Sequence, residues 1–147
     1  MRRLSPFPLL LPLAACATPI SGQYDLRSIN GEPLPWEEIR YTGAEGRVLR
    51  IRELTAATLE LNDDGTCRYV SSSSDRDIPG ADPELRRPPS TDVDHCTWSA
   101  SGRILTLEGP EGRPDEQVVG SVADGVVTLT FSVFGEEFVV VYELAKR

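Results

Sequence analysis

Hydrophobic and polar residues alternate with a period of two along most of the chain between Gly22 and Leu144. Alternation of this kind is typical of β-strands that bury one face. Asn-Gly, Asp-Gly and Ser-Gly turn sequences separate the alternating segments, as in β-hairpins. No segment of useful length has helical periodicity, and residues 36–41 are expected to form at most one helical turn after Pro35. The pattern predicts nine candidate strands, or eight if one merges or fails: 22–29, 47–54, 58–61, 66–71, 93–100, 104–108, 117–122, 126–133 and 137–144.

The apolar positions of these strands define a candidate interior. They are Tyr24, Leu26, Leu49, Ile51, Leu59, Leu61, Tyr69, Trp98, Leu105, Leu107, Val127, Leu129, Phe131, Phe138, Val140, Tyr142 and Leu144. The opposite face carries polar residues, including Asp25, Arg50, Arg52 and Thr128. Antiparallel strands with one apolar, buried face and one polar, solvent-exposed face indicate a barrel or a sandwich. Successive hairpins favour an all-β, antiparallel up-and-down meander, closed into an eight- to nine-stranded barrel without exposed edges.

Two long connections interrupt the meander, at 30–46 and 72–92. Connections of this length are functional or disordered, and the composition of 72–92 leaves both interpretations open. Because each turn of a simple meander moves the chain to the other end, these two connections are expected at opposite ends. Trp36 would then plug one mouth of the barrel, and 72–92 would lie beside 109–115 at the other.

Composition and charge restrict the class of protein. The 147 residues include 15 Lys or Arg and 23 Asp or Glu, for a net charge of −8, and 39% are hydrophobic. These values are ordinary for one globular domain. The arginines are scattered among acidic residues and form no strong basic patch, so binding to nucleic acid through its phosphates is not expected.

The start of the chain has the organisation of an export signal. Two arginines precede an apolar stretch from 4 to 13, and Ala14, Ala15 and Cys16 follow. A cysteine directly after small residues resembles the lipobox of bacterial lipoproteins, in which the thiol is acylated and the peptide is cut just before it. The resemblance implies that residues 1–15 are a removed signal peptide and that Cys16 becomes the lipidated first residue.

The same resemblance implies where the protein is located. Residues 16–21 would form the lipidated N-terminus and a tether, and 22–147 the folded domain. Ala17 stands where some lipoproteins carry an aspartate for retention in the inner membrane, which favours the outer membrane and a periplasm-facing body. Two or three acyl chains would anchor the protein firmly, because a single chain binds only marginally. The alternative, a buried helix over 13–16, conflicts with the flanking charge and the small residues.

The two remaining cysteines, Cys67 and Cys96, form an even number in a chain expected to be exported, which favours a disulfide. Both lie in β-like segments that can pair antiparallel around one long connection. A 67–96 pairing would place Tyr69 opposite Asp94 and would close a loop that stabilises the fold by about 3–4 kcal/mol.

A metal site is the competing interpretation of the same cysteines. It would use Cys67, Cys96 and His95, together with Asp92 or Asp94. His95 and Cys96 are neighbours on a strand and therefore point to opposite faces, which argues against shared coordination. The sequence predicts no metal and no cofactor.

Three motifs resemble the bacterial lipocalin-like lipoproteins. They are Gly22-x-Tyr24-x-Leu26 followed by Asn30-Gly31-x-x-Leu34-Pro35, then Leu59-x-Leu61-x-x-Asp64-Gly65-Thr66-x-x-Tyr69, and Cys96-x-Trp98 before Gly102 and Ile104. The resemblance covers nearly all of residues 22–144. It implies an eight-stranded barrel, but it implies no particular activity, because many such lipoproteins have none assigned.

Residues for catalysis are scarce. His95 is the only histidine, both candidate cysteines are expected to be oxidised, and no Gly-x-Ser-x-Gly nucleophile motif occurs. The adjacent acids Glu37 and Glu38 fall at a predicted turn and are interpreted as a solvated surface. The sequence therefore predicts a protein that is not an enzyme.

Two functions remain open. The first is a binding module that holds a small apolar ligand or lipid against five interior aromatic residues: Tyr24, Tyr69, Trp98, Phe131 and Tyr142. The second is a structural or interaction lipoprotein of the cell envelope whose barrel is packed solid. An eight-stranded barrel is wide enough for either outcome.

Overall fold

The computed structural model describes residues 19–109, 117–133 and 135–145. The predicted signal peptide, the predicted lipidation site Cys16 and residues 110–115 lie outside the described residues. The elements are β1 Gly22–Ile29, β2 Glu32–Pro33, β3 Trp36–Thr42, β4 Val48–Leu61, β5 Thr66–Asp75, the short 3₁₀ helix η1 Pro83–Leu85, β6 Ser90–Ser101, β7 Ile104–Glu108, β8 Val118–Ala123, β9 Val126–Val133 and β10 Glu136–Leu144. Within the described residues, no helix is long and apolar enough to span a membrane.

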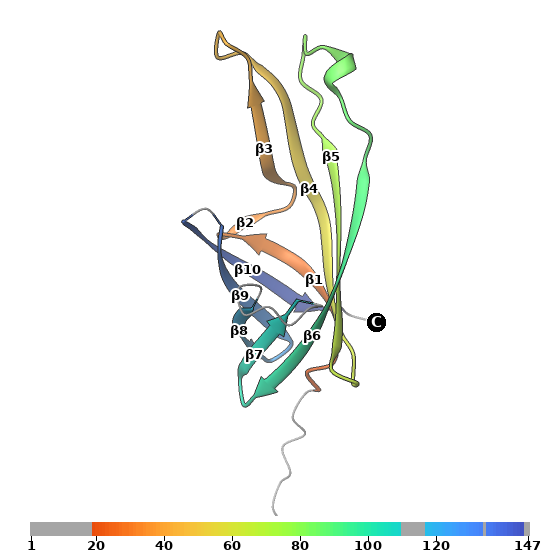
Figure 1. Cartoon of the computed structure of the whole chain (residues 1–147), viewed down its shortest axis with the longest axis vertical. Helices are drawn as coiled ribbons and strands as arrows, with labels where there is room; N and C mark the ends of the chain where they lie inside the picture. Colours follow the sequence, from red (N-terminus) through yellow and green to blue (C-terminus); the bar gives the residue numbers. More distant parts are fainter. Residues whose placement is uncertain (1–18, 110–116, 134, 146–147) are drawn as a thin grey trace, which may run out of the picture.

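Eight of these strands form a closed antiparallel barrel (Figure 1). From β4 to β10 each strand pairs with the next in the chain, and β1 pairs with both β10 and β4. Tyr24 of β1 lies opposite Leu144 on one side and Leu59 on the other. The predicted up-and-down barrel is therefore confirmed, and β2 and β3 are two strands beyond it.

Part of the sheet stands above the barrel (Figure 1). In β4, residues 58–61 pair with β1 and close the barrel, whereas residues 48–54 pair with β3. The end of β5 and the beginning of β6 accompany this first half of β4, because Arg52 lies opposite Asp75 and Ser73 lies opposite Ser90. We call the projecting portions of β3, β4, β5 and β6 the extension.

The predicted strands 47–54 and 58–61 are one strand, β4, and this corrects the expected position of the long connections. Each antiparallel strand takes the chain to the opposite end of the barrel. Because two predicted strands are one, the chain crosses the barrel one time fewer, and every later connection lies at the end opposite to the predicted one. The connections after β1 and after β5 consequently lie at the same end, contrary to the prediction. The extension rises from this end.

The segment from Trp36 to Thr42 also differs from the sequence expectation. It forms strand β3 rather than a helical turn, with Trp36 opposite Leu54 and Tyr41 opposite Arg50. Pairing with a long neighbouring strand supplies backbone hydrogen bonds that the local pattern around Pro35 does not reveal. The segment 72–92 is described throughout: β5 runs on to Asp75, η1 follows at Pro83–Leu85, and β6 begins at Ser90.

A β-bulge at Thr55 reverses the two faces of β4. The register with β5 shifts between Leu54 and Ala56, so that Arg52 and Asp75 become partners. Residues that face each other in a ladder point to the same side of the sheet. The extra residue therefore shifts the alternation, so that even-numbered residues before Thr55 point to the same side as Leu59, an odd-numbered residue after it. Arg50 and Arg52 are therefore on the inward face, which corrects their predicted outward orientation. Leu49 and Ile51 are on the other side of the strand, where Ile51 is buried as predicted and Leu49 is half-buried.

The rest of the predicted interior is confirmed. None of its residues is classed as exposed. Four of the most buried core residues, Tyr24, Leu61, Leu105 and Val127, lie at the end opposite the extension, and Leu59, which is equally buried, lies in the wall of a cavity inside the barrel. At the end opposite the extension, the Tyr24 hydroxyl donates a hydrogen bond to the Ile20 carbonyl over 2.6 Å. This end of the barrel is filled by side chains.

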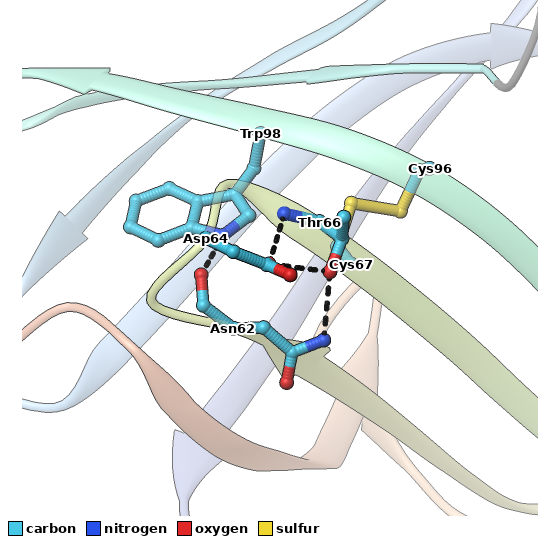
Figure 2. The surroundings of a disulfide bond; sticks show 6 residues. All are labelled: Asn62, Asp64, Thr66, Cys67, Cys96 and Trp98. Carbon is cyan, nitrogen blue, oxygen red and sulfur yellow. Dashed lines mark hydrogen bonds between the residues drawn. A yellow bond between two sulfur atoms is a disulfide. The ribbon is translucent and has the colours of Figure 1, made fainter.

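The β4–β5 hairpin and a disulfide complete the closed end (Figure 2). Cys67 and Cys96 are joined, with their Cα atoms 4.8 Å apart, and Tyr69 lies opposite Asp94 as predicted. Trp98 Nε1 donates to the Asn62 carbonyl at 2.8 Å across the hairpin. The hairpin turn is thus tied to β6 by a covalent bond and by a hydrogen bond.

We expect replacement of both Cys67 and Cys96 by serine to lower the free energy of unfolding by roughly 2–4 kcal/mol, because the bond closes a loop with a sequence separation of 29. Folding should persist, since a chain of this size buries enough apolar surface without the bond. Urea unfolding with and without reductant measures the effect. Reductant should destabilise the natural chain and leave the double variant unchanged; an equal midpoint for all four samples would contradict the prediction.

Candidate functional site: the barrel cavity

A cavity of about 650 Å³ lies inside the barrel. Every barrel strand contributes to its wall, which consists of Leu26, Ile29, Leu59, Tyr69, Asp94, His95, Cys96, Leu107, Glu108, Gly109, Val118, Leu129, Phe131, Val140 and Tyr142. Several of these residues come from the end of β1, β7 or β9 or from the start of β8, and these strand ends lie on the side of the extension. The wall is mostly aliphatic and aromatic.

Three of the five predicted ligand-contacting aromatic residues line this cavity: Tyr69, Phe131 and Tyr142. The other two, Tyr24 and Trp98, belong to the closed end, where each donates a hydrogen bond to a backbone carbonyl. Alternation along a strand determines which face a side chain occupies, but it does not determine how far along the barrel axis it lies. For this reason the sequence could not separate the residues of the cavity from those of the closed end.

Sequence reasoning missed other residues of the wall. Ile29 and Val118 lie at strand ends, where the alternating pattern is too short to assign a face. The sequence offers Asp94 as a candidate metal ligand and as the cross-strand neighbour of Tyr69, but not as a wall residue; it lies two residues before Cys96 and so shares its face. The predicted partnership of Tyr69 with Asp94 was the available signal for this position.

A row of aromatic rings leads from the cavity wall towards the extension. Phe131 stacks on Phe138 with ring centroids 5.8 Å apart, and Trp36 meets Phe138 edge-on at 5.9 Å. Such pairs prefer offset stacking or edge-to-face contact and stabilise beyond the area that they bury. Trp36 therefore connects β3 of the extension with the barrel end that holds the cavity.

Two phenol groups provide polar contacts in the cavity. Burial raises the pKa of Tyr142 far above its usual range, and the charge of Tyr69 and a hydrogen bond with its hydroxyl raise it further. Burial also raises the pKa of Tyr69. Both groups consequently stay protonated and uncharged at neutral pH, and offer hydrogen-bond donors and acceptors in an apolar wall.

A buried ion network holds the extension together. The side chain of Asp75 is only 1% exposed; its carboxylate accepts hydrogen bonds from Arg52 Nη1 at 3.1 Å and from the Arg87 backbone N–H at 2.7 Å. Arg50 Nε lies 3.9 Å from the same carboxylate, and its guanidinium stacks 4.0 Å above the Tyr41 ring. The network joins β3, β4, β5 and the segment before β6.

Within the described residues no group of three or more His, Cys, Asp or Glu side chains could hold a metal ion. The disulfide also occupies both sulfurs of the metal site considered from the sequence. A search of family models finds no match, and no curated protein or solved structure matches the chain.

We expect Asp75→Asn to lower the free energy of unfolding by about 3 kcal/mol at pH 7, because it leaves two largely buried guanidinium groups without a compensating charge. Burial by itself raises the pKa of Asp75, but the Arg87 and Arg52 hydrogen bonds and the nearby charges outweigh it and lower the pKa below its usual value of 3.8. The stability from this carboxylate is therefore present above about pH 4 and is lost as the pH falls through the lowered pKa.

Urea unfolding at a series of pH values tests this expectation. The difference between the natural chain and Asp75→Asn should shrink below pH 4. Asp77→Asn is the matched control, because the Asp77 side chain is 84% exposed and its pair with Arg86 contributes little. Equal effects of the two substitutions would contradict the role assigned to Asp75.

Proposed function

We propose that this protein is a lipid-anchored, periplasm-facing binding protein that holds a small apolar ligand or lipid in the barrel cavity. The cavity itself carries the proposal: it has a volume of about 650 Å³, is open to solvent on one side, and has a mostly apolar wall to which all eight barrel strands contribute. Ligand pockets typically measure about 300–1,000 Å³ and combine apolar walls with a few polar groups. The phenols of Tyr69 and Tyr142 match that description.

The solid-barrel alternative fits the molecule less well. A structural protein without a ligand gains stability by filling its core, because each empty volume forfeits packing contacts. Here the closed end is filled to near-complete burial around Leu105 and Val127, whereas the other half of the barrel retains a large space. Close packing at one end and an opening at the other favour a binding site.

Binding is also a better interpretation than catalysis. His95 belongs to the wall of the cavity, but it lies opposite Arg68, whose side chain pairs with Glu60 on the outer surface, so strand alternation directs the imidazole ring outward. The cysteine that contributes to the wall, Cys96, is oxidised to a disulfide. We therefore propose that the wall holds its ligand without reacting with it.

Filling the cavity should abolish binding. We expect Val118→Trp, which enlarges a half-buried wall residue, to weaken binding of the neutral dye N-phenyl-1-naphthylamine at least about tenfold. The next residue provides the control: Val119 is 48% exposed and points outward, so Val119→Trp should leave dye affinity unchanged. Dye fluorescence titrations on the full chain carrying Cys16→Ala, which excludes acyl groups as competitors, measure both. Unchanged binding by Val118→Trp would contradict the cavity as the site.

The lipid anchor has a separate test. We expect the natural chain, expressed in a Gram-negative host, to be recovered in membranes with the mass of two or three acyl chains, and Cys16→Ala to lack both properties, because the thiol is the attachment point. Membrane fractionation and intact-protein mass spectrometry measure the two. An unchanged membrane fraction in the variant, with no acyl mass in either protein, would remove the lipoprotein hypothesis.

A further inference from the structure

The cavity continues onto a polar surface. On β5 the residues that share a face with Tyr69 are serines followed by Asp75, and on β6 the residues opposite them are Asp94, Asp92 and Ser90. The inward face therefore changes from apolar in the barrel to polar and acidic at the start of the extension. A ligand that extends from the cavity towards the extension meets this surface.

The charge of that surface is uneven. The inward-facing arginines, Arg50 and Arg52, share the single carboxylate of Asp75: Arg52 donates a hydrogen bond to it, and Arg50 approaches it to 3.9 Å with a buried Nε that has no hydrogen-bond partner in the described part of the chain. Among the described residues, no cation lies within ion-pair distance of Asp92 or Asp94, and none of the residues that line the cavity is Lys or Arg. The described boundary between cavity and extension is thus net negative.

Asp94 occupies the boundary itself. It lines the cavity and lies directly opposite Tyr69, two residues from the disulfide that fixes the register of β5 and β6. Burial has the largest effect on the raised pKa of Tyr69, and the charges of Glu38 and Asp94 raise it further, which places both carboxylates within electrostatic reach of the phenol. An acid in this position is close to any polar group at the end of a bound apolar chain.

We infer that the ligand is a cationic amphiphile, whose apolar chain fills the cavity and whose protonated amine lies against Asp94, with Asp92 beyond it. This inference rests on the proposed function and adds the charge of the ligand to it. Hydrogen bonds between ammonium and carboxylate are stronger than those between neutral groups. A carboxylate or phosphate headgroup would instead meet the like charges of Asp94 and Asp92, which are both exposed to solvent.

The test compares three competitors with the same tail. Dodecylamine, dodecanol and dodecanoate are titrated at pH 7.5, below their aggregation concentrations, against N-phenyl-1-naphthylamine bound to the full chain carrying Cys16→Ala. We expect dodecylamine to displace the dye at a concentration about tenfold lower than dodecanol, and dodecanoate to be the weakest. The preference for the amine should decrease as salt concentration rises.

Variants of Asp94 test whether this residue causes the preference for the amine. Asp94→Asn should remove the preference for the amine and preserve displacement by dodecanol, and Asp94→Glu should keep the preference. The control is Asp63→Asn, because Asp63 is exposed in the β4–β5 turn at the closed end and its replacement makes the same charge change away from the cavity. This variant should keep the amine preference of the natural chain. Equal loss in Asp63→Asn and Asp94→Asn would overturn the inference, because net charge would then explain the preference.

The possible outcomes separate the two proposals. If the dye and dodecanol both fail to bind, the proposed function fails. If both bind and the amine has no advantage, or if dodecanoate binds best, the proposed function stands and the cationic ligand is wrong. A tenfold amine preference that disappears only in Asp94→Asn supports both.

Discussion

Backbone hydrogen bonds between β1 and β4 close the barrel, and the rest of the structure depends on this pairing. β1 already pairs with β10, so its second edge joins the two ends of the meander and leaves the eight barrel strands without a free edge among them. When the sheet closes into a barrel, one of its faces becomes the interior. The alternating apolar residues on that face then form a core with a cavity. Because β1 uses only residues 58–61 of β4 in this ladder, the first half of β4 continues past the barrel and builds the extension with β3.

The bulge at Thr55 decides the chemistry of the inward face. Without the extra residue, Leu49 and Ile51 would continue the apolar face of Leu59, and the extension would present an aliphatic surface to the mouth of the cavity. With it, the inward positions before the bulge are the buried Leu54 and then Arg52 and Arg50, which meet Asp75. One local irregularity thus converts an apolar strand face into a polar one where the cavity opens.

The two ends of the barrel differ in packing. At the closed end Tyr24 and Trp98 each find a backbone carbonyl, the disulfide joins β5 to β6, and the core residues there are almost fully buried. At the other end the wall is built from the same kinds of residue but encloses about 650 Å³. At the closed end the disulfide joins facing residues of β5 and β6 and so fixes the register of these two strands below the cavity.

Period-two alternation and turn chemistry determined much of this protein from the sequence alone. They predicted the meander, most of the interior, and the opposed positions of Cys67 and Cys96, because these properties depend on neighbouring residues and on hairpin geometry. The tertiary structure decided the merger of two predicted strands into β4, the bulge at Thr55, the shared end of the long connections and the division of the aromatic residues between cavity and closed end. These features depend on which distant strand completes each hydrogen-bond ladder, and a period of two carries no information about that choice or about depth along the barrel axis.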